Sequence, residues 1–485
     1  MPSVKKSFAW SAVEQFVPKL IQVAVTILLA RVLEPTDYGL VGMLAVFIGI
    51  AMVLADSGLS ASLIQKKEVT QDDETSVFYI NIGLGLSLAL LLCAISPLVA
   101  QFYDQDLLVP LLCLQSLSIV VSSFAIVQRA LMTRAMEFHK MALITLAGTT
   151  VSGCVAVGMA YAGWGVWSLI GMLLSGNITQ VILFWISSSW SPRGNVRIAN
   201  IRKIWDFSSY LLYCQLIGIV FQNMYSVIIG KFYSPASLGY YDRAQKLHML
   251  PAGTMSGMIG KVAFPLFSQI QDDKELLLCR MRELIRVSLL FSAAGMSLLA
   301  LIADPLVPLL MTEKWMPSVP LLRILCYSAM ICPISSMFLM ALQAQGYSKL
   351  NFRLESMKMA IGVIVVLSAA SFGIEALAWS VVVSRCIAYF INVWYHVKLL
   401  GYRWKSQAFD ILPTFVLCAV AAFIAWQVTA VDIDNALLHM MMLSSVFVLS
   451  LGAGIFCFRS IFFQDLWKHG NQTIGLLRRQ LLKSS

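Results

Sequence analysis

Ionisable side chains stand inside long apolar runs of this sequence, where they could bind a charged ligand. Basic residues dominate the group, which consists of Glu14, Lys19, Asp56, Arg243, Lys246, Lys261, Arg323 and Arg385. A charged side chain at the middle of a membrane-spanning helix costs about 2.5–3.5 kcal/mol, so such groups are expected to face a bundle interior or a wet cavity. Lys and Arg offset phosphate charge best where water is scarce. The set therefore predicts a cationic cavity for an anionic ligand such as a diphosphate.

Each of these residues also has a plainer interpretation. Arg243, Lys246 and Arg323 stand near helix ends and could extend to the outer interface with their charged tips in water. Lys19 and Arg385 lie deeper, which favours them as cavity residues. Glu14 could form an ion pair with Lys19, or it could bind a cation or proton that is coupled to transport. Asp56 could likewise be an ion-pair residue or a coupling residue.

Sequence patterns typical of enzymes are missing. The five histidines show no HExxH or other metal-ligand spacing, and the sequence has neither a P-loop nor a GxSxG motif. The ten cysteines lie mostly in apolar runs without CxxC spacing, which favours a packing role. We therefore expect no catalytic residues, no metal and no cofactor, and the chain alone is no ATP-driven pump.

The elements that carry the charged residues must be membrane-spanning helices. Of the 485 residues, 59% are hydrophobic and 12% are charged, whereas an average soluble domain has about 25% charged residues. Apolar runs of roughly 20 residues, enough to cross a hydrocarbon core, follow one another with short polar breaks. We predict an all-α integral membrane protein with about fourteen transmembrane helices, at 8–30, 39–63, 78–100, 108–128, 142–162, 165–186, 207–230, 238–268, 285–309, 319–342, 357–373, 376–398, 411–430 and 437–458.

The net charge of +10 is explained by membrane topology rather than by nucleic-acid binding. A nucleic-acid-binding protein gathers its Lys and Arg on one face or groove, whereas here they are spread over short breaks. One alternate set of breaks holds most of them, and the opposite set holds chiefly Arg31, Lys231 and Lys314. Because basic residues near span ends are retained in the cytoplasm, both termini are predicted to be cytoplasmic.

An internal repeat appears at an offset of 200 residues. Pro35 and Gly39 match Pro235 and Gly239, and each copy stands at the outer end of the first span of a six-span block. This predicts two six-helix bundles in parallel orientation, with substrate handled between them. The alternative is that Pro-x-x-x-Gly is only a good turn between helices. The predicted organisation is an N-terminal bundle at 1–200, a C-terminal bundle at 201–400, two extra transmembrane helices at 401–458 and a cytoplasmic amphipathic basic tail at 459–485.

Several short motifs follow one another in a fixed order along the chain. They include Leu29-Ala30-Arg31-Val32-Leu33, Asp56-Ser57-Gly58, Gln128-Arg129-Ala130-Leu131-Met132, Phe264-Pro265-Leu266-Phe267 and Glu313-Lys314-Trp315. As an ordered set they resemble polysaccharide-exporting flippases of the Wzx type, in the colanic acid exporter branch. This resemblance implies the multidrug/oligosaccharidyl-lipid/polysaccharide flippase superfamily. Its fold is two six-helix bundles in a V shape, with alternating access to a central cationic cavity.

The resemblance also implies a cargo and a location. The cargo is an undecaprenyl-diphosphate-linked oligosaccharide, turned from the cytoplasmic to the periplasmic leaflet of a bacterial inner membrane for exopolysaccharide, capsule or O-antigen synthesis. Implied partners are this lipid-linked sugar, the lipid bilayer and, transiently, the polysaccharide polymerase and chain-length machinery. Two alternatives stay open at this point. One is a cation-coupled multidrug exporter of the same superfamily, and the other is a membrane glycan polymerase or ligase.

Overall fold

The computed structural model describes residues 4–56, 60, 63–64, 66, 69–195, 198–428 and 435–457. Every regular element in these ranges is a helix, which confirms the prediction of an all-α fold for the described part of the chain. The basic tail predicted at 459–485 lies outside these residues. The helices group into two compact units, Met1–Asp242 and Arg243–Ser485.

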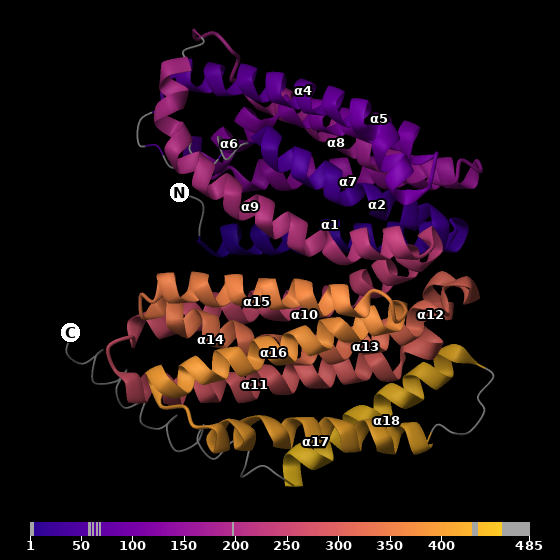
Figure 1. Cartoon of the computed structure of the whole chain (residues 1–485), viewed down its shortest axis with the longest axis vertical. Coiled ribbons are helices and arrows are strands. Elements are labelled where there is room, and N and C mark those ends of the chain that lie inside the picture. The colour runs from indigo at the N-terminus through magenta and orange to yellow at the C-terminus, as the bar shows by residue number, and fades with distance from the viewer. Residues whose placement is uncertain are drawn as a thin grey trace. The chain divides into compact units, whose positions relative to one another are not determined.

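The first unit is built from long helices packed side by side, and Figure 1 shows α4 along α5 and α7 along α8. Helix α7 also packs against α1, and α9 packs against α2 and α4. These contacts place α9 in the first unit. The repeat in the sequence predicts a boundary between the two bundles at residue 200, near the start of α9. The helices are α1 (Val4–Val32), α2 (Pro35–Asp56), α4 (Gln71–Tyr103), α5 (Leu108–Ser123), α6 (Ile126–Arg134), α7 (Phe138–Tyr161), α8 (Trp167–Ser187), α9 (Ile198–Phe232) and the first turns of α10 (Pro235–Gln269).

The start of α4 shows how polar residues fix a helix end in this unit. The Thr70 hydroxyl accepts the Asp73 N–H at 3.3 Å, and the Asp73 carboxylate accepts the Thr70 N–H at 3.1 Å, an arrangement that satisfies two backbone donors of the first turn. Lys66 pairs with the same carboxylate at 2.5 Å. The Trp190 indole N–H donates to Glu74 at 2.7 Å, so the chain after α8 is tied to this end of α4.

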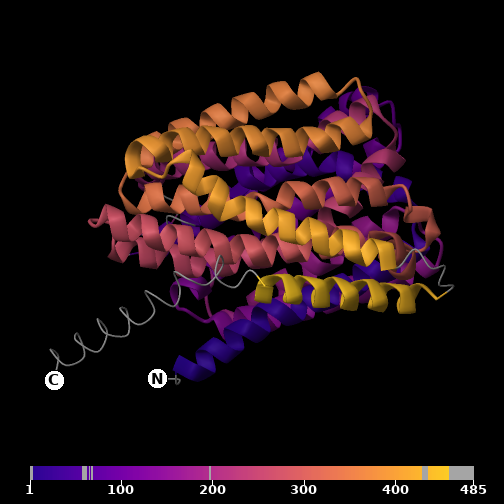
Figure 2. The same cartoon turned by 90° about the horizontal axis from the view of Figure 1, so that it is seen from below.

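The second unit holds the remainder of α10 and the helices that follow it. Its core joins α10, α11, α14 and α16 through buried aromatic and aliphatic side chains that include Phe267, Ile285, Phe338 and Tyr402. Figure 2 shows α18 beside α17, and α17 also packs against α11. The elements are α11 (Lys274–Leu301), α12 (Ala303–Met311), the short 3₁₀ turn η1 (Glu313–Trp315), α13 (Ser318–Met330), α14 (Cys332–Ala344), α15 (Ser348–Ala369), α16 (Ile374–Leu400), α17 (Trp404–Val428) and α18 (Ala436–Cys457).

A buried charged cluster attaches α17 to α11. The side chain of Asp410 is 0% exposed. It accepts hydrogen bonds from Arg282 Nε at 2.7 Å, from Arg286 Nε at 2.7 Å and from the Tyr402 hydroxyl at 2.6 Å. Tyr402 lies in the loop before α17, where burial and the Asp410 carboxylate raise the pKa of its hydroxyl. The hydroxyl therefore stays protonated as a donor, and the carboxylate is fully satisfied.

Nine described helices are long and apolar enough to cross a membrane, or ten if the bent pair α5 and α6 counts as one span. Each predicted span falls on a helix or on a pair of consecutive helices. The total of fourteen spans therefore stays a prediction. Helix α10 is not among the nine, and it carries Arg243, Lys246, His248 and Lys261. So many polar groups require a position where part of the helix faces away from lipid.

Candidate functional site

Arg385 on α16 is a cation held in place by neutral partners. Its Nη1 donates to the Ser328 carbonyl oxygen at 3.1 Å and contacts Cys332 Sγ at 2.8 Å. Ser328 stands in the last turn of α13, where carbonyl groups lack intrahelical donors and a cation is favoured. No carboxylate among the described residues pairs with Arg385. Its guanidinium is therefore held by two neutral groups of the same unit.

Helix α10 brings further basic groups to the second unit. Arg243 and His248 are buried, at 3% and 5% exposed, and His248 lies within electrostatic range of Arg385. Lys246 and Lys261 are exposed on the same helix. The structure thus brings His248 and Arg385 together, which sequence reasoning missed because the histidines were examined only for metal-ligand spacing. No local pattern pairs these two residues, because they lie on different helices, α10 and α16.

Lys19 and Asp56 belong to the first unit. Lys19 is exposed on α1. Asp56, the last residue of α2, accepts a hydrogen bond from the Ser60 hydroxyl at 2.9 Å. Arg129 lies within electrostatic range of Asp56 and places its guanidinium over the Phe184 ring at 5.3 Å. The Glu14 side chain lies outside the described residues, so its pairing with Lys19 stays a prediction.

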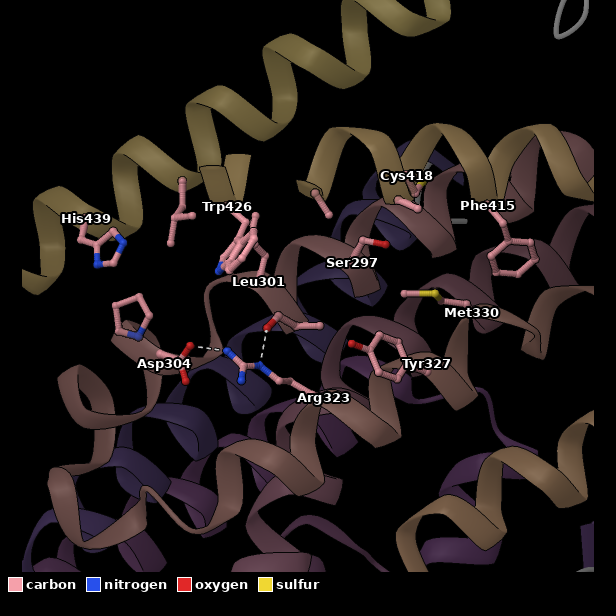
Figure 3. Close-up of a pocket in the computed structure, with 15 residues that line it drawn as sticks. Ser297, Leu301, Asp304, Arg323, Tyr327, Met330, Phe415, Cys418, Trp426 and His439 are labelled. Carbon is pink, nitrogen blue, oxygen red and sulfur yellow. Dashed lines mark hydrogen bonds and ion pairs between the residues drawn. The ribbon is translucent and has the colours of Figure 1, made fainter. Parts of the chain in front are cut away.

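Arg323 lies in a different setting, at the edge of a cavity of about 620 Å³. Figure 3 shows its guanidinium between Asp304 and a backbone carbonyl, that of Ala300, which accepts from Nε at 3.2 Å. Because Nη2 forms an ion pair with Asp304, the charge of Arg323 is already matched. Helices α11, α12, α13, α17 and α18 supply the walls, with Tyr327, Met330, Phe415, Trp426 and His439 among the lining residues. This cavity is mostly apolar and is poorly suited to a diphosphate.

Breaking the Arg323–Asp304 pair should have a small effect. The two side chains are 38% and 53% exposed, and exposed ion pairs contribute about 0–1 kcal/mol. Asp304→Asn is therefore expected to lower the free energy of unfolding by less than about 1 kcal/mol. Thermal unfolding of the purified variant in detergent measures this effect. A loss comparable to that of a buried pair would contradict the assignment of Arg323 as a surface cation.

The described residues contain no group of three His, Cys, Asp or Glu side chains arranged to hold a metal ion. The polar groups described around Arg385 are the Ser328 carbonyl oxygen, the Cys332 thiol and the His248 imidazole.

Comparison with known proteins gives three kinds of similarity. Residues 28–320 match a family model described as "Polysaccharide biosynthesis protein". The lipopolysaccharide biosynthesis protein WzxC of Escherichia coli K12 is 25% identical over 72% of this chain and 71% of its own length. The teichuronic acid biosynthesis protein TuaB of Bacillus subtilis 168 is 22% identical over 94% of this chain and 95% of its own. The solved structure of the lipid II flippase MurJ, in an inward closed conformation, superposes with a TM-score of 0.75 at 15% identity, over 95% of this chain and 99% of MurJ.

Proposed function

Because the chain belongs to the polysaccharide biosynthesis protein family, we propose that it is a flippase that moves a lipid-linked oligosaccharide from one leaflet of the membrane to the other. Membership bears out the resemblance of its motifs to polysaccharide exporters. WzxC and TuaB are named for the synthesis of surface polymers, and MurJ, whose fold it shares, is named as a flippase of a lipid-linked molecule. These names support the class of cargo proposed here.

The observation that carries the proposal is the basic site around Arg385. A diphosphate offers oxygen acceptors to a guanidinium, and charge-assisted hydrogen bonds of this kind are strong where water is scarce. Arg385 is already oriented by the Ser328 carbonyl oxygen, so it does not lose further freedom on binding. We propose that the diphosphate of an undecaprenyl-linked sugar pairs with Arg385 and neighbouring basic groups of α10. The sugar then occupies the wet interior while the prenyl tail stays in lipid.

Transport itself requires that the site be open to one side at a time. We propose about fourteen spans, with residues 1–200 and 201–400 as two bundles of parallel orientation that alternate access to the site. Pro35 and Pro235 are each the first residue of a helix, α2 and α10, so the two copies of the repeat occupy equivalent positions. Basic residues in alternate breaks support cytoplasmic termini in a bacterial inner membrane. Transient association with a polymerase and its chain-length machinery fits delivery of the cargo to the periplasmic leaflet.

Lys19 should contribute less than Arg385 because its side chain is exposed, whereas the Arg385 guanidinium is held by the Ser328 carbonyl oxygen. Pairing of an exposed charge gives about 0.2–1 kcal/mol, so Lys19→Ala is expected to lower transport only about 1.5- to 5-fold. Lys19→Arg, which keeps the charge, is the matched control and should transport normally. The yield of surface polysaccharide relative to the amount of protein in the membrane measures both. A loss in Lys19→Ala as large as that in Arg385→Ala would contradict this ranking.

Deletion of the gene in its native host tests the function. We expect loss of surface polysaccharide and accumulation of complete undecaprenyl-diphosphate repeat units, because synthesis in the cytoplasmic leaflet continues while translocation stops. If the protein were a multidrug exporter, deletion of its gene would leave the polymer intact and change drug resistance. If it were a polymerase, deletion would leave single repeat units on the periplasmic side, where externally added glycosidase reaches them.

A further inference from the structure

Three exposed cations stand around the turn that joins α16 to α17, and no carboxylate in the described part of the chain pairs with them. They are Lys398 in the last turn of α16, Arg403 in the turn itself and Lys405 in the first turn of α17. The sequence has no Asp or Glu from residue 376 to residue 409. Asp410, the next acidic residue, is fully buried in the cluster that attaches α17 to α11. This end of the second unit therefore carries a local positive charge.

The turn is fixed by contacts on its buried side. Gly401 ends α16 in the left-handed region, at a φ of 69°, a conformation that glycine adopts without strain. Tyr402 is buried and donates its hydroxyl to Asp410 at 2.6 Å. Its carbonyl oxygen accepts a hydrogen bond from Gln407 Nε2 at 2.8 Å. Because Tyr402 is held inward, the cations on either side of it stay at the surface and need little further ordering to bind an anion.

Exposed aromatic rings continue from the cations along α16. Phe390, Trp394 and Lys398 are spaced four residues apart and so share one face of the helix. The two aromatic side chains are 55% and 56% exposed, and the Lys398 ammonium lies 4.9 Å from the centre of the Trp394 ring. The Trp404 ring lies 5.9 Å from the Phe390 ring, so the start of α17 extends the same surface. This surface is apolar along α16 and cationic at its end.

We propose that this surface binds one anionic phospholipid of the cytoplasmic leaflet. We name it the α16–α17 surface, and it consists of Phe390, Trp394, Lys398, Arg403, Trp404 and Lys405. The three cations take the phosphate of the headgroup, and the acyl chains lie along the two rings of α16. Tryptophan side chains gather at the level of lipid headgroups, and Lys and Arg beside a span attract anionic lipids.

Charge and exposed apolar area together select this occupant. A zwitterionic headgroup has no net charge for the three cations to offset. A free phosphate would leave the Phe390 and Trp394 rings exposed, whereas a phospholipid covers them with its chains. The basic residues of this turn belong to a break that is predicted to be cytoplasmic, which gives the leaflet. The α16–α17 surface shares no residue with the site around Arg385, so the inference goes beyond the proposed function.

A photoreactive phosphatidylglycerol, with a diazirine on one acyl chain, tests the site. Purified full-length protein in phosphatidylcholine nanodiscs is illuminated with a low concentration of this probe, and mass spectrometry maps the adducts. We expect the adducts to gather at residues 390–409 and to be displaced by unlabelled phosphatidylglycerol. Arg403→Gln with Lys405→Gln should lower labelling there roughly 25-fold, about five-fold for each cation removed. Lys398→Gln alone should lower it about five-fold.

Lys349→Gln with Arg353→Gln is the matched control and should label as the parent does. Both residues are exposed cations of the second unit at the start of α15, so their removal tests a general effect of surface charge. They lie on another side of α16. Asn392 faces α15, because its side-chain oxygen accepts a hydrogen bond from Lys358 at 3.2 Å, and Trp394, two residues further on, points away from it.

Two results would overturn the site. One is equal labelling of residues 390–409 by the phosphatidylcholine analogue of the probe, and the other is unchanged labelling in Arg403→Gln with Lys405→Gln. Displacement of the probe by undecaprenyl diphosphate, but not by phosphatidylglycerol, would assign the surface to a polyprenyl lipid and would equally reject the proposal. Because labelling requires no transport, its result is independent of the proposed function.

Discussion

Replacing Arg385 by alanine is expected to lower transport of the lipid-linked sugar roughly 10- to 150-fold, the loss of one hydrogen-bonded charge interaction of about 1.5–3 kcal/mol. Its guanidinium is held by the Ser328 carbonyl oxygen and contacts Cys332 Sγ, and the described residues give it no carboxylate partner. An incoming diphosphate would therefore meet an unmatched charge. Initial rates in vesicles, normalised to the amount of inserted protein, measure the effect.

Two further variants separate charge from position. Arg385→Lys keeps the charge but loses the planar fork that binds two oxygens at once, so partial transport is expected. Asp304→Asn is the matched control, because it alters the surroundings of another arginine of the same unit, Arg323, which pairs with Asp304. This variant should transport at the parent rate. Transport by Arg385→Ala at the parent rate, with normal insertion, would remove Arg385 from the binding site.

Replacing Asp410 by alanine is expected to lower the free energy of unfolding by about 3–5 kcal/mol, because removal of one member of a buried ion pair leaves the other charge uncompensated. Here the loss affects two guanidinium groups, those of Arg282 and Arg286, and the Tyr402 hydroxyl. The cluster joins α11 to α17, so the change should loosen the attachment of α17. Thermal or denaturant unfolding of the purified protein in detergent measures it.

Asp410→Asn provides the comparison, since it keeps an oxygen acceptor while removing the negative charge. Its stability should fall between those of the parent and Asp410→Ala. Equal stability of all three proteins would show that water or lipid replaces the carboxylate at no cost, and the cluster would then have no role in holding α17.

Much of the fold could be predicted because apolar runs of span length leave a clear periodic signal. The breaks inside the spans were harder. The break between α13 and α14 has a sequence signal in Pro333, near the first residue of α14. The bend of 43° between α5 and α6 has none, because neither Phe124 nor Ala125 is a helix breaker. There the Trp185 indole N–H donates to the Phe124 carbonyl oxygen at 3.0 Å, a tertiary contact that no local pattern reveals.

The sequence predicts which types of residue form the site, but it does not predict which side chains pair with one another. The cost of placing a charge inside a span makes Arg323 and Arg385 equally good candidates for the binding site. Only the structure shows that Asp304 forms an ion pair with Arg323. Arg286 stands at the start of the predicted span 285–309, and no local pattern reveals that its side chain binds Asp410, 124 residues away. The Pro-x-x-x-Gly repeat was visible in the sequence as a repeat or a turn. In the structure Gly39 packs so closely on the other copy that a Cβ atom there would lie 1.7 Å from the Pro235 carbonyl oxygen. This contact depends on how two helices meet, which the spacing does not specify.

Movement of the cargo by the purified protein tests the central claim most directly. Proteoliposomes would contain a fluorescent undecaprenyl-diphosphate oligosaccharide from the native host, and a membrane-impermeant glycosidase outside would report the fraction in the outer leaflet. We predict that the parent protein, without ATP, makes the inner-leaflet pool accessible and that Arg385→Ala does so roughly 10- to 150-fold more slowly. No increase over protein-free vesicles, under any imposed proton or sodium gradient, would contradict the account.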